Sequence, residues 1–329
     1  MRRVIIFGIV MVFSLMSISS AIAQDKPVTL KWGHHFKSDF FIAVATQKIV
    51  ELVKERTGGK FIIEVYPSAQ LGGFFQMLTS TSQGTLDLAW TEGGNVSRLY
   101  PPCGVTGGAY LFRSIRHVQN FWDSPVGLKI QQGMYDQANL KAFPAFQYGS
   151  RQLTTSKKMV KTPEDLKGVR IRSLENRVSL TNVKALGANP SPVDYSELYM
   201  ALQQGIVDGQ ENPIPSIFSM KFYEVQKYLF FTNHNHEFIF PVMNSRVWER
   251  LPANYKKIFT DALLEVRPIS EKMLADLTAD NLKSMTARGL QVHEVNVEAF
   301  RNFAIPIVLA EFGKDWFPNI YEDIKKVPD

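Results

Sequence analysis

The strongest constraint on the fold is an alternation of strand and helix patterns that begins near residue 28. A strand is predicted over residues 28–32, with its apolar side chains on one face, because successive side chains in a strand point to opposite sides. A helix with an apolar stripe follows and runs to about Arg56. Ser38 or Asp39 is its predicted N-cap, since short oxygen-bearing side chains accept the first free N–H groups.

The alternation continues through residue 90. Gly58 and Gly59 end the first helix, and the sequence KFIIEVYP has the alternating character of a strand. A second helix is predicted over residues 74–83, ends at Gly84, and leads to the strand LDLAW. This βαβαβ order predicts an α/β domain with parallel strands.

The second half of the chain repeats this order. A strand is predicted in VRIRS, followed by helices over residues 177–186 and 196–204. The helix end Gln83-Gly84 with Asp87 is matched by Gln204-Gly205 with Asp208, and Gly59-Lys-Phe-Ile-Ile is matched by Gly168-Val-Arg-Ile-Arg. These matches predict two lobes of related architecture with a cleft between them, where ligands usually bind.

The last third of the chain is mainly helical. Residues 252–288 have helical periodicity over an unusual length, and Pro268 is expected to kink or split this helix. A late strand is predicted in LQVHEV and a further helix over residues 297–312, bent near Pro306. A helix as long as the first could lie across both lobes.

The N-terminus has the pattern of an export signal. Residues 1–23 carry two arginines, then an apolar run, then the ending Ala21-Ile22-Ala23, which is typical of a cleaved secretory signal peptide. An uncleaved membrane anchor is the alternative, but the apolar run is short for a bilayer. The single cysteine, Cys103, cannot form an internal disulfide, so a bacterial periplasmic location is favoured.

The length and the net charge of the chain narrow the class of protein. A chain of 329 residues is long for a single core, so two domains are the natural expectation. The formal net charge of +6 is spread along the sequence without a block of Lys or Arg, which argues against nucleic-acid binding.

The segment GVRIRSLEN presents two arginines within one predicted strand. Arg170 and Arg172 share a face, and Val169 and Ile171 share the other. From this alternation alone, surface arginines paired with a local acid such as Glu164 are the favoured interpretation, because most charges on strands face solvent.

Five segments together resemble the solute-binding receptors of tripartite ATP-independent periplasmic (TRAP) transporters, in the dicarboxylate-binding-protein branch. They occur in the family's order and are EVYPSAQLGG (64–73), GSRQLTT (149–155), TPEDLKGVRIR (162–172), ALGANPSPVDYSELYMALQQGIVDGQENP (185–213) and KFYEVQKYL (221–229). The resemblance implies a two-lobed α/β periplasmic-binding-protein fold, type II-like, with a hinged cleft and a long helix spanning both lobes. It also implies capture of a small organic acid and its delivery to a membrane permease powered by an ion gradient.

The resemblance also gives a division into lobes and an assembly state. Lobe I is expected to comprise residues 24–149 and about 238–277, and lobe II residues 150–237 and about 278–329. The receptor is expected to be a monomer that needs no cofactor and binds no nucleic acid.

Three residues are carried over from the family as ligand contacts. Arg172 matches the family arginine that pairs with the ligand carboxylate. An arginine suits this role because its planar guanidinium offers two parallel N–H donors to the two carboxylate oxygens. Arg151 matches a second arginine near the carboxylate, and Asn212 an asparagine that hydrogen-bonds the ligand. Arg170 is expected to remain a surface residue.

The rest of the predicted site lies outside these motifs. His35 follows the first strand, Trp90 and Glu92 end the strand LDLAW, Asn95 lies in a glycine-rich stretch, and Glu237 follows a second-lobe strand. Aromatic and polar groups together suit either an aromatic acid or a hydroxylated one. The ligand stays open among dicarboxylates, keto acids, sugar acids and aromatic acids.

Three alternative functions are compatible with parts of the sequence. A metal could be bound by His34, His35, His234, His236 and Glu237, but adjacent histidines in an extended segment point apart, and no metal-binding motif is present. A receptor for an ATP-driven importer of an anionic solute or metal shares the two-lobe architecture. A periplasmic enzyme acting on organic acids is the third, although no nucleophile elbow, phosphate loop or dinucleotide fingerprint occurs.

Overall fold

The computed structural model describes residues 27–329, so the predicted leader over residues 1–23 lies outside the described residues. The predicted alternation in the first lobe is confirmed. Its elements are β1 (Val28–Gly33), α1 (Phe41–Arg56), β2 (Phe61–Tyr66), α2 (Phe74–Gln83) and β3 (Leu88–Thr91).

The predicted cap of α1 is wrong. Phe40 occupies the N-cap position in an extended conformation, and no side chain there accepts a helix N–H. Phe40 is buried and its ring stacks on that of Phe36, with the ring centroids 5.2 Å apart. Because the chain first buries this aromatic pair, the helix starts after both Ser38 and Asp39.

The two lobes share one arrangement of strands. In lobe I, β1 pairs in parallel with β2 and with β3. In lobe II, β6 (Arg170–Ser173) pairs in parallel with β7 (Asn189–Pro192) and with β8 (Gly209–Pro213), joined by α6 (Arg177–Ala185) and α7 (Leu198–Gln203). The strand orders β2-β1-β3 and β7-β6-β8 are therefore equivalent, as the repeated sequence pattern predicted.

A pair of aspartates marks this equivalence. Asp87 precedes β3 and accepts the backbone N–H of Lys31 in β1 at 2.8 Å, while Asp208 precedes β8 and accepts that of Arg170 in β6 at 2.9 Å. The second sequence match, of Gly59 with Gly168, equates β2 with β6, which occupy different positions in the strand orders of the two lobes. That part of the predicted repeat is wrong.

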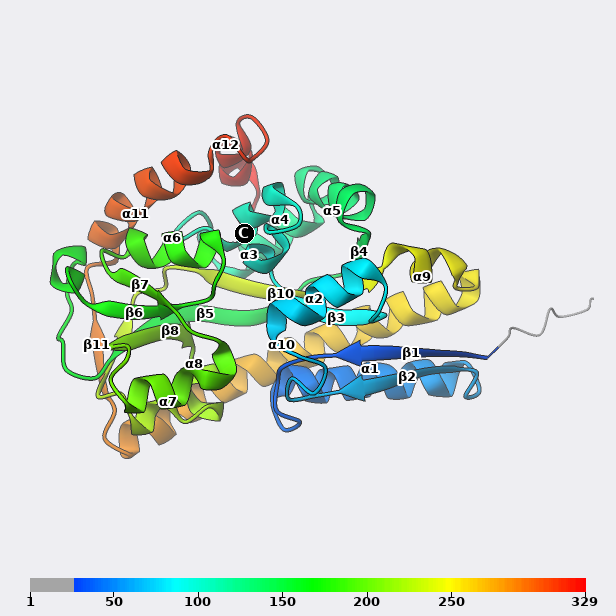
Figure 1. Ribbon diagram of the computed structural model, residues 1–329, viewed down its shortest axis with the longest axis horizontal. Coiled ribbons are helices and arrows are strands. Elements are labelled where there is room, and N and C mark those ends of the chain that lie inside the picture. The colour runs from blue at the N-terminus through cyan, green and yellow to red at the C-terminus, as the bar shows by residue number, and fades with distance from the viewer. Residues whose placement is uncertain (1–26) are drawn as a thin grey trace, which may run out of the picture.

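Two long strands connect the lobes. β5 (Phe146–Thr155) pairs with β10 (His236–Asn244) through its first half, and with β8 and β9 (Tyr228–Phe231) through its second half. β10 continues into lobe I, where it pairs with β3 and β4 (Leu140–Ala142). Figure 1 shows β5 and β10 running side by side between the two halves.

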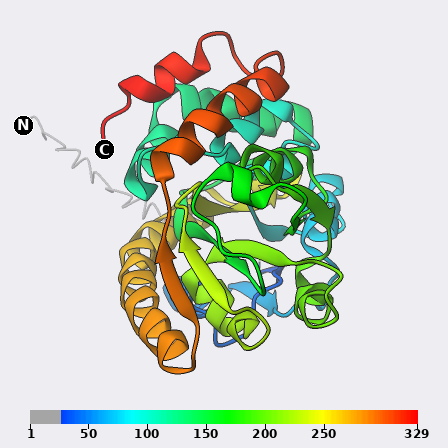
Figure 2. The same cartoon turned by 90° about the vertical axis from the view of Figure 1, so that its left-hand side faces the viewer.

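One long helix, α10 (Ala253–Ala287), also spans both lobes, running from the right-hand half to the lower left of Figure 1 and along one side in Figure 2. Phe259 packs in the lobe I core and Met285 in the lobe II core. Pro268 was predicted to kink or split this helix; it does not split it, and the kink stays a prediction. Proline leaves the carbonyl of Leu264 without its helical N–H, but Leu264 is 45% exposed, so water can satisfy that carbonyl.

The C-terminal part covers the top of the molecule. β11 (Gln291–Glu294) pairs with β9, and α11 (Val297–Phe312) follows with the bounds predicted for it and contains Pro306. The remaining α-helices are α3 (Gly93–Val96), α4 (Ile115–Asp123), α5 (Pro125–Ala138), α8 (Ile214–Ser219), α9 (Ser245–Arg250) and α12 (Ile320–Lys326). Within residues 27–329, no helix is both long and apolar enough to span a bilayer.

The last residues contact lobe I. The ring of His117 in α4 lies 2.9 Å from the carbonyl oxygen of Ile324, and Arg113 pairs with Asp329 at 3.2 Å. The predicted boundaries place residues 278–329 in lobe II, so the C-terminal end bridges the predicted division. The boundaries themselves stay a prediction.

Candidate functional site

A cavity of about 30 Å³ lies between the lobes, close to the carboxyl ends of β1, β3, β6 and β8, where open α/β sheets usually place their ligands. Lobe I, lobe II and the connecting strands all contribute to its walls. The lining residues are His35, Phe36, Phe74, Glu92, Tyr148, Arg151, Arg172, Leu174, Tyr195, Asn212, Glu237 and Ile239.

Arg172 is the residue of this cavity with the most unused hydrogen-bonding capacity. Its side chain is 1% exposed, and Nε donates to the carbonyl oxygen of Val193 at 2.8 Å. Nη2 is buried and has no hydrogen-bond partner among the described residues. Burial lowers the pKa of the guanidinium to about 10. A buried cation without a counter-ion is costly, so an anion that pairs with it would be strongly favoured.

Arg170, two residues earlier on the same face of β6, has a different environment. Its side chain is about half exposed and pairs with Asp208 at 2.8 Å, and Nη2 also donates to the carbonyl oxygen of Gly205. Strand β6 begins at the surface and ends in the cleft. Arg170 and Arg172 therefore differ in burial although their side chains lie on the same face of the strand. Arg170 is a surface residue, as expected.

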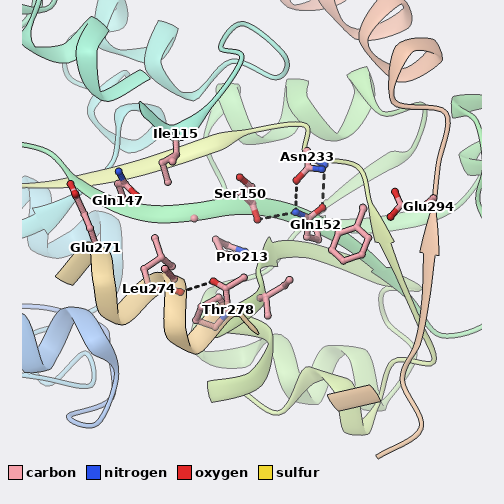
Figure 3. A pocket seen from close by; sticks show the side chains of 15 residues that line it. Ile115, Gln147, Ser150, Gln152, Pro213, Asn233, Glu271, Leu274, Thr278 and Glu294 are labelled. Carbon is pink, nitrogen blue, oxygen red and sulfur yellow. Dashed lines mark hydrogen bonds between the residues drawn. The ribbon is translucent and has the colours of Figure 1, made fainter. Parts of the chain in front are cut away.

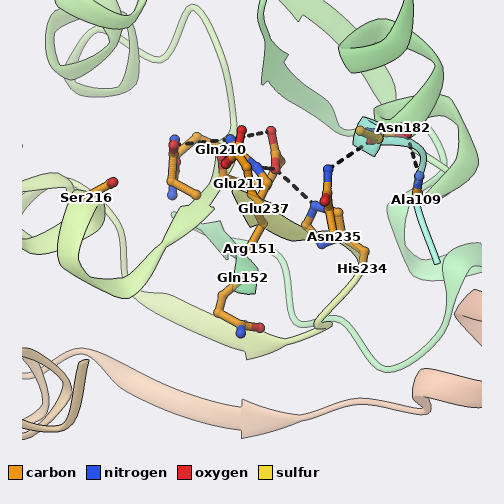
Figure 4. Close-up of polar contacts among 12 residues, drawn as sticks. Ala109, Arg151, Gln152, Asn182, Gln210, Glu211, Ser216, His234, Asn235 and Glu237 are labelled. Atoms are coloured by element: carbon orange, nitrogen blue, oxygen red, sulfur yellow. Dashed lines mark hydrogen bonds and ion pairs between the residues drawn. The ribbon is translucent and has the colours of Figure 1, made fainter. Parts of the chain in front are cut away.

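Arg151 lies in the same cavity, but its guanidinium is already engaged (Figure 4). Nε pairs with Glu211 and Nη1 with Glu237, while Nη2 donates to Asn212 Oδ1 at 3.1 Å. Burial works to lower the pKa of Arg151, but the two glutamates outweigh it and hold the pKa well above its usual value. Arg151 therefore organises a buried polar network.

The network extends through Glu211 and Asn212. His234 Nε2 lies 3.0 Å from Glu211 Oε2, and Asn212 Nδ2 donates to Gln210 Oε1 at 2.6 Å. Burial works to raise the pKa of Glu211, but Arg151 and His234 outweigh it and lower the pKa to about 2. Asn212 is 2% exposed, and it lines the cavity with its amide held on both sides.

Two further carboxyl groups, those of Glu92 and Glu237, line the cavity. Glu92 caps the short helix α3 and accepts the backbone N–H groups of Gly94 and Asn95. Burial, and next the charge of Glu237, raise the pKa of Glu92 to about 7. Burial also raises the pKa of Glu237, against the opposing effect of Arg151.

His35 brings the two lobes into contact across the cleft. Its ring centroid lies 4.3 Å from that of Phe74 in lobe I and 5.5 Å from that of Tyr195 in lobe II. Burial, and next the neighbouring His34, lower the pKa of His35 to about 3, so its ring is neutral at physiological pH. The four histidines considered above do not converge: within residues 27–329 no group of three or more His, Cys, Asp or Glu side chains is placed to hold a metal ion.

Two predicted residues lie elsewhere. Trp90 is fully buried in the lobe I core, where its ring stacks on Trp32 at 5.4 Å and its Nε1 donates to Thr46 at 2.8 Å. It lines none of the described cavities. Asn95 accepts a hydrogen bond from Asn176 at 3.1 Å and lines a wider space of about 530 Å³ that shares Phe74 with the inner cavity. We call this space the mouth.

Two tyrosines of the cavity were not predicted. The Arg172 guanidinium carbon lies 5.9 Å from the ring centroid of Tyr195, and Ser216 donates to the hydroxyl of Tyr148 at 2.8 Å. Tyr195 falls within the segment VDYSELY, so its motif was a usable signal. Tyr148 precedes Gly149, near a register shift in the pairing of β5 with β10, and strand alternation gave no signal there.

A cavity of about 570 Å³ lies behind β5 (Figure 3). Gln147, Ser150 and Gln152 line it, whereas Tyr148 and Arg151 of the same strand line the inner cavity. None of its lining residues is Arg, Lys or His. Despite its size, this rear cavity offers no cation to an acidic ligand.

Comparison with known proteins gives a consistent result. The family model for bacterial extracellular solute-binding proteins, family 7, matches residues 32–315. The sialic acid-binding periplasmic protein SiaP of Vibrio cholerae is 29% identical over 294 residues, covering 89% of this chain and 91% of that protein.

Solved structures agree with this match. A TRAP periplasmic solute-binding protein from Polaromonas sp. JS666, bound to D-erythronate, has a TM-score of 0.86 and 31% identity, covering 92% of this chain and 99% of that one. One from Actinobacillus succinogenes, with bound L-galactonate, has a TM-score of 0.86 and 27% identity over 91% and 98% of the two chains.

Proposed function

The chain belongs to the bacterial extracellular solute-binding proteins of family 7, and from this premise we propose that its interlobe cleft captures a small organic acid by the carboxylate group. The protein is then the receptor of a TRAP transporter and delivers the acid to the membrane permease. Similar receptors were solved with D-erythronate and L-galactonate, which are both organic acids.

The free Nη2 of Arg172 is the observation that carries this proposal. It is buried without a partner in a cavity that both lobes line. A ligand carboxylate would supply the missing counter-ion and accept two parallel N–H groups. Charge-assisted hydrogen bonds contribute roughly 1.5–3 kcal/mol each. Micromolar affinity corresponds to about 8 kcal/mol, so this one contact would supply a large part of it.

The other site residues then have distinct roles. Asn212 offers its amide to the ligand, and Arg151 orients Asn212 through the hydrogen bond to its Oδ1. His35, Glu92 and Glu237 contact the rest of the ligand from lobe I and the connecting strands, with Asn95 at the mouth. Trp90, as a core residue, is left out of this set.

The lobes close on the ligand by a shift of population. The ligand touches both lobes only in the closed form, so binding favours that form. His35 with Tyr195, and Asn95 with Asn176, are contacts between the predicted lobes that this closure would make.

The family description and the SiaP match support a location outside the cytoplasm, in the periplasm. We further propose that residues 1–23 are a cleaved signal peptide and that the mature protein is a monomer that binds no nucleic acid. Mass spectrometry of the exported protein would give its N-terminus, and light scattering its mass.

A receptor for an ATP-driven importer and a periplasmic enzyme are the alternatives. The relatives support the TRAP class. An enzyme would convert its substrate, whereas a receptor returns its ligand unchanged, so incubation with each bound acid followed by product analysis separates the two.

Calorimetry tests the role of Arg172. A thermal-shift screen over organic acids first identifies a ligand, because binding raises apparent stability. We expect Arg172→Ala to weaken its binding at least about tenfold, or about 1.4 kcal/mol. Arg172→Lys should also lose much of the affinity, because an ammonium cannot offer paired donors. Unimpaired binding by both folded variants would exclude this role.

A further inference from the structure

The walls of the inner cavity differ in charge. Arg172 stands on the lobe II side with a buried Nη2 that lacks a partner. Glu92, which follows β3 of lobe I, and Glu237, near the start of the connecting strand β10, line the same cavity, and we call this pair the acid wall. Arg151, the other cation that lines the cavity, already pairs with Glu211 and Glu237.

The acid wall keeps acceptor capacity for a ligand. A carboxylate has about four acceptor positions on its two oxygens. Glu92 uses its oxygens to accept two backbone N–H groups, and Glu237 accepts from Arg151 through Oε2. Among the described residues, no hydrogen bond reaches Oε1 of Glu237. Ligand groups that donate hydrogen bonds, such as hydroxyls, would be satisfied there.

A second carboxylate has no comparable partner. An acid held at Arg172 would lie against the acid wall, because Glu92 and Glu237 line the same small cavity as Arg172. The mouth offers Arg98, but this side chain lies over the ring of Phe75 and donates to the carbonyl oxygen of Glu175. The mouth is also lined by three acidic residues, Glu175, Asp194 and Glu197. A second negative charge would therefore meet like charges in either direction.

We propose that the ligand is a hydroxylated monocarboxylate, whose carboxylate pairs with Arg172 and whose hydroxyls donate to Glu92 and Glu237. This inference rests on the proposed function and names the ligand class within it. Above about pH 7, where Glu92 is ionised, the two glutamates select against dicarboxylates by repulsion. They select against acids without hydroxyls, because such an acid leaves the buried Oε1 of Glu237 without a donor.

Matched acids test the inference. meso-Tartrate differs from D-erythronate, and galactarate from galactonate, only by a second carboxylate in place of a terminal CH₂OH, and butyrate carries no hydroxyl. Thermal shift and calorimetry on the whole mature protein would give an affinity for each. We expect at least one of the two monocarboxylates to bind about tenfold or more tightly than its dicarboxylate partner, and butyrate to bind weakly.

Variants of the acid wall sharpen the test. Glu237→Gln should lower the affinity for the monocarboxylate. Because it removes a negative charge, it should also reduce the ratio of the affinity for the monocarboxylate to that for the dicarboxylate. Glu92→Gln is the second variant, in case the first does not fold. Arg170→Gln, on the surface, is the matched control and should leave both affinities unchanged.

Three results would overturn the inference: both dicarboxylates binding as tightly as their monocarboxylate partners, butyrate binding as tightly as the hydroxylated acids, or no binding by any of these acids. The Arg172 variants separate this failure from failure of the proposed function. If they lose binding of a dicarboxylate, the receptor mechanism stands and only the ligand class is wrong. If they bind every acid as the wild type does, the mechanism itself is wrong.

Discussion

The two lobes are built on the same frame but differ where that frame meets the cleft. Trp32 in β1 pairs with Leu88, the residue after Asp87. In the same way, Ile171 in β6 pairs with Gly209, the residue after Asp208. The residue that follows Trp32 in β1 is Gly33, and the residue that follows Ile171 in β6 is Arg172. Equivalent positions therefore carry no side chain in one lobe and the free guanidinium in the other.

Packing explains this difference. A Cβ placed on Gly33 would lie 2.8 Å from Met77 Sδ and 3.2 Å from Leu86, so the apolar core of lobe I fills the space. In lobe II the side chain of Arg172 lines the cavity instead. The shared frame thus fixes where strands end, and local packing decides which strand end can carry a functional group.

The largest effect is expected from a change to Arg151, the ion-paired arginine that lines the same cavity as Arg172. Arg151→Ala would leave the buried Glu237 without its ion-pair partner and Glu211 with His234 alone. We expect it to lower the free energy of unfolding by about 3–5 kcal/mol. Urea denaturation measures this, with Arg172→Ala as the control that should change stability by less than about 1 kcal/mol. Equal losses in the free energy of unfolding would contradict the distinction between the ion-paired guanidinium of Arg151 and the unpaired one of Arg172.

The carboxyl groups should show a similar contrast with pH. The pKa of Glu92 is raised from 4.5 to about 7, and each unit of difference between folded and unfolded chain is worth about 1.4 kcal/mol. Glu92 thus favours folding below about pH 4.5, and this contribution, roughly 3 kcal/mol, is lost as the pH rises through 7. Glu211, with its pKa lowered to about 2, has the opposite sign and contributes above pH 4.5.

The variant Glu92→Gln isolates the first of these groups. We expect the stability of Glu92→Gln relative to the wild type to rise between pH 4.5 and pH 8, as followed by urea denaturation at each pH. A difference between the two proteins that does not change over this range would contradict the raised pKa.

A smaller effect is expected at the strand end of lobe I. Gly33→Ala would force Met77 and Leu86 to move, and overpacking of this kind costs about 1–3 kcal/mol. Arg172→Ala is the matched control, since it places the same residue at the equivalent position without that crowding. A thermal unfolding midpoint for Gly33→Ala equal to that of the wild type would show that the core of lobe I can adapt.

The smallest effects should come from the shared aspartates. Asp87→Ala and Asp208→Ala each remove the acceptor of one strand N–H, which should cost about 0.5–1.5 kcal/mol. Asp208→Ala also removes the exposed pair with Arg170, which adds at most about 1 kcal/mol. Both variants should keep the wild-type ligand affinity in calorimetry, and a loss in either would mean that the frame residues also act on the site.

Much of the fold was already determined by local patterns in the sequence. The period of apolar residues and the glycine stops located β1, α2 and α11 to within a residue or two, because helix and strand periodicity depend on neighbouring residues. The repeat of Gly84–Asp87 at Gly205–Asp208 also identified equivalent turns in the two lobes. The family motifs predicted Arg172, Arg151 and Asn212 as ligand contacts. The structure places all three at one cavity, and their contact with a ligand stays a prediction.

What the sequence could not decide depends on contacts between distant residues. Arg170 and Arg172 are alike in local pattern, and only the docking of the lobes exposes one and buries the other. The acidic partners of Arg151 lie 60 and 86 residues away along the chain, so its engagement is invisible to any local pattern. Trp90 resembled a cleft residue because it ends a strand, yet its side chain points into the lobe I core. Burial and pairing are set by long-range packing, and therefore only the tertiary structure distinguished the free cation from the paired one.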